Sequence, residues 1–348
     1  MHKKIIIVGA GPAGVGMACL LKRCKVDAII LDQGRIGESF LSWPKEMRFI
    51  SPSFTGNFFG AVDLNAITPD SSPAFGLQTE HPTGAEYAQY LRDIVEHYEL
   101  DVREHTKVMK IETQKPFRLH TKKELFTCDY LIWAGGEFQF PTHIPHTTRI
   151  RDYSALPRTK HIIIGGAESG IDAAYHLTRR GDEVVVLDKS APWNERYSDS
   201  SYGLSPYSLD RLRAIQETGL ATFIDEHATE ITQDHVQTEN HTFPATFPAL
   251  NATGFDMKKS LAGELFTITD GYPEITEHDE STKVPGVFLV GPRVRHEGAI
   301  FCFIYKFRQR FGVVAKRILA SHHPSIAEYA DKGFLLEDLS CCGNECEC

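Results

Sequence analysis

The chain has 348 residues, a formal net charge of −9 and a hydrophobic content of 42%, and it is long enough for two domains with full cores. An acidic balance without a long basic cluster argues against nucleic-acid and anionic-membrane partners. No run of about 20 apolar residues is present, so no transmembrane helix is predicted. Met1 leads into an apolar strand without a signal-peptide pattern, and the expected compartment is the cytoplasm.

A glycine-rich turn follows the first predicted strand. Residues 5–8 are apolar and β-branched, a helical pattern opens at Pro12, and Asp32 closes a second apolar run at 28–31. This order of strand, turn, helix, strand and acid is typical of a dinucleotide site. The helix N-terminus at Pro12 and Ala13 is expected to face the pyrophosphate, because its free N–H groups favour an anion.

Each glycine of this motif has a predicted task. Gly9 permits the tight turn, Gly11 lets the backbone approach a pyrophosphate, and Gly14 lets the helix pack closely on the strand. Asp32 is expected to accept hydrogen bonds from ribose hydroxyls.

The next elements are less regular. Residues 34–82 are loop-rich, and such a segment inside a compact domain is usually functional. A helix is predicted over 84–98, and a small hairpin over 108–113 and 117–121. A buried strand at 130–133 then enters a turn at Ala134 and Gly135.

A second copy of the nucleotide motif begins near residue 161. Apolar residues 162–164 precede the turn, Asp188 closes another apolar run, and the turn itself holds the candidate binding residues Gly165, Ala167, Ser169 and Gly170. The match is weaker, because Ala167 places a methyl group where a phosphate should approach. Two copies suggest two nucleotides held face to face, usually a flavin and a nicotinamide. Asp188 taken alone favours NADH over NADPH, because a carboxylate repels a 2′-phosphate.

The rest of the sequence completes the second unit and then returns to the first. Ser205 is a predicted helix N-cap, strands are expected at 221–224 and 231–238, and a helix at 300–319 exposes Lys306, Arg308 and Arg310 on a solvated face. The simplest assembly is an α/β chain of two Rossmann-like domains, the second inserted into the first. Residues 1–155 and 246–348 would form the FAD-binding domain, and 156–245 the NAD(P)-binding domain.

These motifs resemble the two-dinucleotide-binding flavoprotein superfamily, specifically its flavin-monooxygenase-like and thioredoxin-reductase-like branches. The resemblance implies FAD on the first motif and NADH or NADPH on the second. It implies further cofactor contacts at Gly37, Ser39, Phe40 and Trp43, which are similar to a monooxygenase segment beside the flavin, and at the turns of Ala134, Gly135, Gly254 and Gly291. The monooxygenase fingerprint expected between 136 and 165 is absent, as is a closely spaced cysteine pair of thioredoxin-reductase type.

The eight cysteines fall into two groups. Cys19, Cys24, Cys128 and Cys302 lie in apolar or helical patterns and are expected to be buried, although Cys302 is placed by sequence to approach the flavin. Cys341, Cys342, Cys346 and Cys348 crowd the C-terminus, which resembles the tail of mercuric reductases and implies a thiophilic metal partner. An idle terminus is the alternative.

Three functions remain open at this level. The leading hypothesis is an FAD-dependent oxidoreductase of flavin-containing monooxygenase type that acts on a small molecule. The second is a flavin-dependent reductase of a disulfide, metal or metalloid that uses the cysteine tail, and the third is a non-catalytic nucleotide-binding sensor. No catalytic residue is assigned, the substrate is not identified, and a homodimer is left open.

Overall fold

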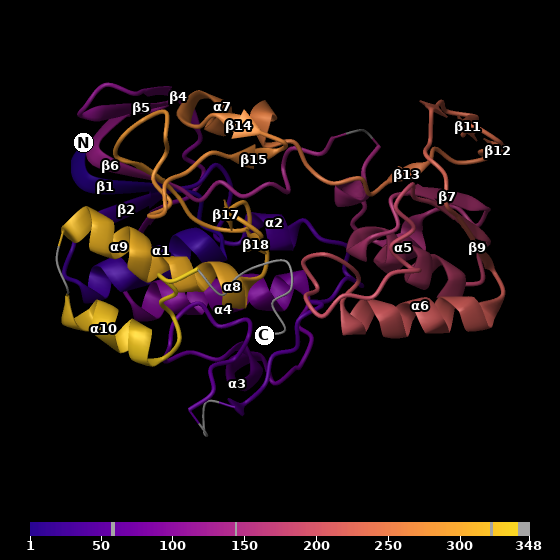
Figure 1. Ribbon diagram of the computed structural model, residues 1–348, viewed down its shortest axis with the longest axis horizontal. Helices are drawn as coiled ribbons and strands as arrows, with labels where there is room; N and C mark the ends of the chain where they lie inside the picture. The colour runs from indigo at the N-terminus through magenta and orange to yellow at the C-terminus, as the bar shows by residue number, and fades with distance from the viewer. Residues whose placement is uncertain (57–59, 143–144, 321–322, 340–348) are drawn as a thin grey trace.

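The computed structural model describes residues 1–56, 60–142, 145–320 and 323–339, which form two lobes side by side (Figure 1). The larger lobe contains the N-terminal part of the chain and the C-terminal part as far as residue 339, and the smaller lobe contains the middle. The predicted α/β class with two Rossmann-like units is confirmed. The domain limits stay a prediction.

The larger lobe is built on a mixed sheet of order β3-β2-β1-β6-β5-β4, with β16 also paired to β6. Its strands are β1 (His2–Val8), β2 (Ala28–Leu31), β3 (Asp101–Arg103), β4 (Val108–Glu112), β5 (Phe117–Thr121), β6 (Leu125–Trp133) and β16 (Val287–Leu289). Its helices are α1 (Pro12–Arg23), α2 (Glu38–Leu41), α3 (Pro73–Leu77), α4 (Gly84–His97), α7 (Ala262–Leu265), α8 (Ile304–Phe307), α9 (Phe311–Leu319) and α10 (Pro324–Asp331). Two short hairpins complete it, β14 (Ile268–Thr269) with β15 (Tyr272–Pro273), and β17 (Arg295–His296) with β18 (Ala299–Ile300).

The smaller lobe has a parallel sheet of order β13-β7-β8-β9. These strands are β7 (His161–Ile164), β8 (Val184–Leu187), β9 (Ala221–Ile224) and β13 (Leu250–Asn251), joined through the helices α5 (Glu168–Arg179) and α6 (Pro206–Thr218). A separate antiparallel sheet holds β10 (Glu230–Ile231), β11 (His235–Gln237) and β12 (Thr242–Pro244).

Local sequence signals explain why these elements form where they do. In α4, Thr83 and Glu86 form a reciprocal capping box, and Tyr87, Leu91 and Ile94 turn one apolar face into the core. The β1 residues Ile5–Ile7 are fully buried between α helices and neighbouring parallel strands, as expected for a strand covered on both faces.

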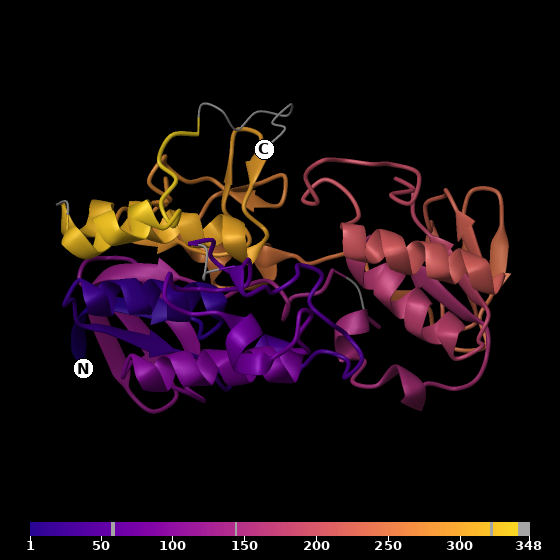
Figure 2. The ribbon, with the colours of Figure 1, turned by 90° about the horizontal axis from the view of Figure 1, so that it is seen from below.

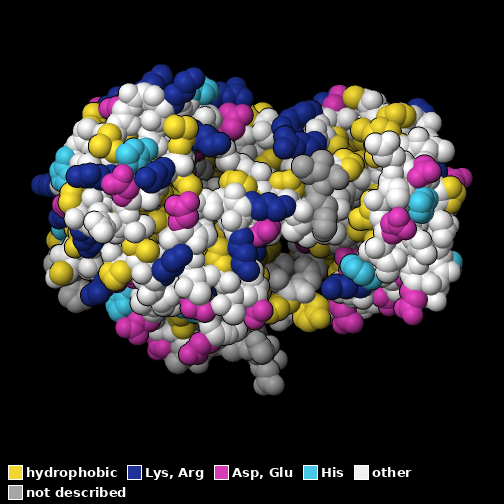
Figure 3. Space-filling model, turned by 90° about the horizontal axis from the view of Figure 1, so that it is seen from above, with side chains coloured by type: hydrophobic (Ala, Val, Ile, Leu, Met, Phe, Trp, Pro, Cys, Tyr) yellow, Lys and Arg dark blue, Asp and Glu magenta, His cyan; other side chains and the backbone are white. Residues whose placement is uncertain are grey.

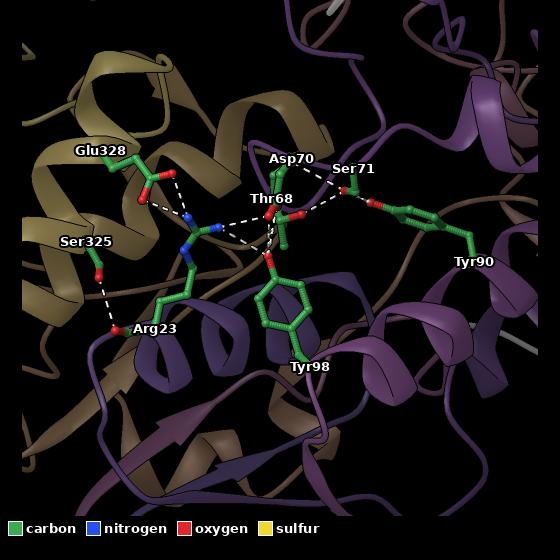
Figure 4. A network of polar contacts seen from close by, with 8 residues as sticks. All are labelled: Arg23, Thr68, Asp70, Ser71, Tyr90, Tyr98, Ser325 and Glu328. Carbon is green, nitrogen blue, oxygen red and sulfur yellow. Dashed lines mark hydrogen bonds and ion pairs between the residues drawn. The ribbon is translucent and has the colours of Figure 1, made fainter.

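A polar network joins the two ends of the chain (Figure 4). Arg23, at the end of α1, donates to both Glu328 oxygens of α10 at 2.6 and 2.7 Å and to Asp70 Oδ2 at 3.0 Å. The Tyr98 hydroxyl donates to Asp70 Oδ1 at 2.8 Å. Figure 2 shows α9 and α10 beside α1 along the larger lobe. The C-terminal helices therefore belong to the first unit.

Two sequence expectations about secondary structure are wrong. The predicted helix at 300–319 begins only at Ile304, because Ile300 pairs in β18, and a 3-10 turn at Arg308–Arg310 interrupts it. The predicted strand at 231–238 is a hairpin of β10 and β11, because the Thr232 hydroxyl donates to the His235 carbonyl across a tight turn.

The solvated face predicted for that helix, which also includes Lys316 and Arg317, is wrong at Arg308 and Arg310, whereas Arg317 is exposed. Arg310 is fully buried and donates to Asp279, which is equally buried, at 2.9 Å, and to the carbonyl of Leu336 at 2.6 Å. Arg308 donates to the carbonyl of Ala66 at 2.7 Å, and burial lowers its pKa to about 10. The 3-10 turn changes the angular spacing of the side chains, so both guanidinium groups point inward.

No helix within the described ranges is both long enough and apolar enough to cross a bilayer.

Candidate functional site

A cavity of about 1520 Å³ lies where the two lobes meet. Figure 3 shows the molecule hollowed between the lobes, with Lys and Arg side chains on the rim. Most of the predicted cofactor-binding residues line this cavity: Gly9, Gly11, Pro12, Ala13, Asp32, Gly37, Ser39, Phe40, Trp43, Ala134, Gly135, Ala167 and Ser169. Residues of both glycine-rich motifs therefore face one shared space.

The first glycine-rich turn has the shape that a dinucleotide requires. Gly9 has φ +114°, and a Cβ added to it would lie 2.3 Å from the carbonyl oxygen of Ala134. A Cβ on Gly14 would lie 1.9 Å from the Gly9 carbonyl oxygen, so α1 packs tightly against the turn. A Cβ on Gly11 would meet no protein atom within 4 Å. The open space beside Gly11, at the start of α1, fits a pyrophosphate bound by free backbone N–H groups.

Asp32 closes β2 at the wall of this cavity. Its Oδ2 accepts from the Ala10 amide at 2.6 Å, and its Oδ1 accepts from the Gly34 amide at 2.7 Å. Burial raises the pKa of Asp32, and the two backbone donors oppose that rise. The carboxylate is thus fixed by the turn itself, in a position that fits ribose hydroxyls.

The second turn repeats this construction in the smaller lobe. A Cβ on Gly170 would lie 1.9 Å from the Gly165 carbonyl oxygen, and Asp188 Oδ2 accepts from the Gly166 amide at 2.7 Å. Ala167, the N-cap of α5, lines the cavity. Six of the predicted binding residues are not among those that line the cavity: Gly14, Gly165, Gly170, Asp188, Gly254 and Gly291. The glycines at 14, 165 and 170 shape the turns, and a direct cofactor contact by any of the six stays a prediction.

Gly254 and Gly291 hold the surrounding segments together. The Gly254 carbonyl accepts from the Thr142 amide at 3.1 Å, which joins the two segments that cross between the lobes. Gly291 has φ +111°, and a Cβ there would lie 3.1 Å from the Ala13 Cβ, so the end of β16 touches the first motif.

An aromatic wall closes one side of the cavity. The ring centroids of Phe40 and Trp43 are 5.0 Å apart, those of Phe40 and Phe49 are 5.4 Å apart, and all three residues line the cavity. These rings present apolar surface to the space beside the first motif.

Glu168 is a cavity residue that the sequence analysis did not single out. Its carboxylate accepts from the Ser205 amide at 2.6 Å and from the hydroxyls of Ser205 and Ser208, so it bridges the N-termini of α5 and α6. Burial raises its pKa although these donors work against the rise. An acid in the first helical turn was the only local signal, and only the packing of α6 shows what the carboxylate faces.

Another cluster lies at the cavity wall around Cys302 and Ser201, and of these two only Cys302 was singled out from the sequence. Cys302, predicted to be buried, lines the cavity and donates from Sγ to the Ser201 hydroxyl at 3.2 Å. Lys306, predicted to be solvated, donates to Asp199 at 2.5 and 2.6 Å and to Ser201 at 2.7 Å. Burial raises the pKa of Cys302, so its thiol is protonated at neutral pH. Burial also works to raise the pKa of Asp199, but the ammonium group of Lys306 and the hydrogen bonds from Ser201 together outweigh it, and the pKa is lowered.

The predicted metal ligands at the C-terminus, Cys341, Cys342, Cys346 and Cys348, lie outside the described residues. Within the described part of the chain, no group of three or more His, Cys, Asp or Glu side chains could hold a metal ion. The other cysteines there, Cys19, Cys24 and Cys128, are buried as predicted.

Known proteins are similar to this chain in sequence and in fold. The bacilliredoxin reductase Bdr of Bacillus subtilis is 26% identical over 344 residues, which cover 91% of this chain and 98% of that protein. The structure of the bacillithiol disulfide reductase Bdr from Staphylococcus aureus has a TM-score of 0.71 at 22% identity and covers 93% of this chain and 100% of its own. A flavin-containing monooxygenase from Stenotrophomonas maltophilia has a TM-score of 0.68 at 18% identity, over 92% and 98% of the two chains.

The family model of the pyridine nucleotide-disulphide oxidoreductases matches residues 6–291. This match includes both glycine-rich turns and β16, and the predicted membership of the two-dinucleotide-binding flavoproteins is confirmed. The predicted cofactors, FAD and NAD(P)H, and the prediction of an enzyme are confirmed as well. The chain belongs to the pyridine nucleotide-disulphide oxidoreductase family and is an FAD-dependent oxidoreductase that uses a pyridine nucleotide.

Proposed function

We propose that this enzyme is an NAD(P)H-dependent reductase of a small-molecule disulfide. The observation that carries the proposal is the shared cavity, which residues of both glycine-rich turns line and which can hold two nucleotides and a small substrate. The relatives named for bacilliredoxin and bacillithiol disulfide reduction support it, because one of them matches this chain over almost its whole length.

The residues divide the work between binding and chemistry. The open backbone at Gly11 and the Asp32 carboxylate would hold the ADP half of FAD, and the α5 N-terminus with Asp188 would hold the nicotinamide nucleotide. Bound FAD supplies the two-electron relay between the nicotinamide and the substrate. NAD(P)H gives a hydride, solvent gives one proton, and the substrate S–S bond becomes two thiols.

Among the described cysteines, only Cys302 lines the cavity. The described residues therefore include no two thiols that face the cavity together. The raised pKa of Cys302 disfavours the thiolate that disulfide exchange requires. We infer that electrons pass to the substrate disulfide without an obligatory mixed disulfide at Cys302. A Cys302→Ser variant should therefore keep most of its disulfide reductase activity.

A second candidate is the monooxygenase reaction, in which NAD(P)H, a proton and O₂ give an oxygenated product and water. The aromatic wall of Phe40, Trp43 and Phe49 favours it, because oxygenation requires a water-poor flavin environment. The similar fold of the Stenotrophomonas maltophilia monooxygenase is compatible with either reaction.

Anaerobic rapid mixing separates the two candidates. The enzyme is first reduced with one equivalent of NADH or NADPH and is then mixed either with oxygen or with the disulfides of glutathione, cysteine and coenzyme A. We expect fast flavin reoxidation by a disulfide, with two thiols released per NAD(P)H. Reoxidation by oxygen alone, coupled to an oxygenated sulfide or ketone, would reject the reductase in favour of the monooxygenase.

A further inference from the structure

The two lobes are covalently joined by only two segments, which leave the larger lobe after β6 and return to it after β13. Hydride transfer needs the donor and acceptor atoms about 3–3.5 Å apart, so small errors in lobe orientation are costly. Two crossing segments do not fix an orientation to that precision. Non-covalent contacts between the lobes must therefore set it.

One such contact is made by the loop of residues 191–204, which we call the strap. It follows β8 and the second acid, Asp188, and its residues 200–203 line the cavity. From the larger lobe, Lys306 binds Asp199 and Ser201, and Cys302 donates to Ser201 at 3.2 Å. The Tyr202 hydroxyl donates in turn to the Gly298 carbonyl. The strap thus reaches from the smaller lobe to the segment that precedes α8.

The Lys306 bridge is stronger than an ordinary surface ion pair. The side chains of Lys306 and Asp199 are only 20% and 31% exposed, and the ammonium group makes charge-assisted hydrogen bonds to both carboxylate oxygens. Such bonds are about twice as strong as neutral ones. A shared acceptor, the Ser201 hydroxyl, links this bridge to Cys302 at the cavity wall.

Other contacts between the lobes act away from the strap. The His81 and Tyr207 rings stack with centroids 4.3 Å apart, and Lys45 binds Asp152, whose neighbour Tyr153 packs into the core of the smaller lobe. The strap differs from them because it is continuous with the end of β8 and also forms part of the cavity wall.

We propose that the strap latches the two lobes in the arrangement in which hydride transfer occurs, and that Lys306 is the positioning residue of this latch. Lys306 acts through Asp199 and Ser201 and need not touch either cofactor. The enzyme then reduces its flavin in this arrangement, without a rotation of one lobe against the other. This inference rests on the proposed placement of both cofactors in the shared cavity.

A cross-link tests the arrangement directly. Ser201→Cys would place a second thiol beside Cys302, since the present Oγ and Sγ atoms are 3.2 Å apart, a separation from which a disulfide can form. The full-length variant is oxidised with diamide, and peptide mass spectrometry confirms the link between the introduced thiol and Cys302. Flavin reduction by NADH is then followed anaerobically at the flavin band before and after cleavage of the link with a phosphine. The matched control is Ser201→Cys combined with Cys302→Ser, which cannot form the link.

The expected result is a flavin reduction rate in the cross-linked protein within fivefold of the rate after cleavage. A larger loss that cleavage restores would show that the lobes must move, and would overturn the proposal. Failure of the link to form would overturn it too, because the arrangement would not be populated. Failure of the proposed function would look different, since the wild-type flavin would still be reduced by the nicotinamide but would not be reoxidised by a disulfide.

A second pair of variants tests Lys306 itself. Lys306→Met should lower the limiting rate of flavin reduction at least fivefold, whereas the Kd for NADH and the FAD content stay within threefold of wild type. Lys306→Arg should restore the rate, because it can keep the bridge to Asp199. A smaller effect of Lys306→Met on the limiting rate, or an equal loss of NADH binding, would show that Lys306 is not a positioning residue for hydride transfer.

Discussion

Alanine at Gly11 and alanine at Gly14 should separate two roles of the first glycine-rich turn. A Cβ at Gly11 meets no protein atom within 4 Å, and its φ of −84° is open to any residue. Gly11→Ala should therefore change the unfolding free energy of the apoprotein by less than about 1 kcal/mol. The same methyl group would occupy space needed by the pyrophosphate. Overpacking of that kind costs about 1–3 kcal/mol, which is roughly 5- to 150-fold in the Kd for FAD.

Gly14→Ala should behave in the opposite way. Its Cβ would lie 1.9 Å from the Gly9 carbonyl oxygen and 3.3 Å from the Ala134 Cβ, so the apoprotein itself must shift. We expect a loss of about 1–3 kcal/mol in apoprotein stability, measured by urea unfolding, in addition to weaker FAD binding measured by quenching of flavin fluorescence. Wild-type FAD affinity in Gly11→Ala, or equal destabilisation of both apoproteins, would refute the assignment of Gly11 to the pyrophosphate.

Three further predictions address other parts of the molecule. NADH should reduce the flavin about tenfold faster than NADPH, because the Asp188 carboxylate repels a 2′-phosphate. Asp188→Ser should bring the two reduction rates closer together. Faster reduction of the wild-type flavin by NADPH would show that Asp188 does not select NADH. Arg310→Met should cost about 3–5 kcal/mol of unfolding free energy, because it breaks a fully buried ion pair and leaves Asp279 with the His296 ring as its remaining partner among the described side chains; recovery in Arg310→Met combined with Asp279→Leu is the control. The Thr238 hydroxyl and His241 lower the pKa of Glu226 from 4.5 to about 2, so its contribution to stability is present above pH 4.5 and is lost as the pH falls toward 2. Glu226→Gln should flatten the acid limb of the stability profile, and an unchanged limb would contradict the assignment.

The sequence predicted what depends on local geometry. A glycine with a positive φ, a helix N-terminus and an acid at the end of the next strand must follow one another at short range, so both nucleotide motifs, Asp32 and Asp188 could be found from residue order alone. The N-cap of α6 at Ser205 was found for the same reason. The return of the chain to the first sheet at β16 followed from its apolar run and the glycine after it.

Only the tertiary structure decided how these parts meet. Lys306 and Arg310 lie in a helical pattern that reads as solvated, yet one binds the strap and the other is buried against Asp279. Their partners are distant in sequence, and no local pattern encodes which charges will face one another. Residue order could place both nucleotide turns along the chain, but the packing of two lobes brought them to one cavity, because lobe orientation is fixed by long-range contacts rather than by local backbone geometry.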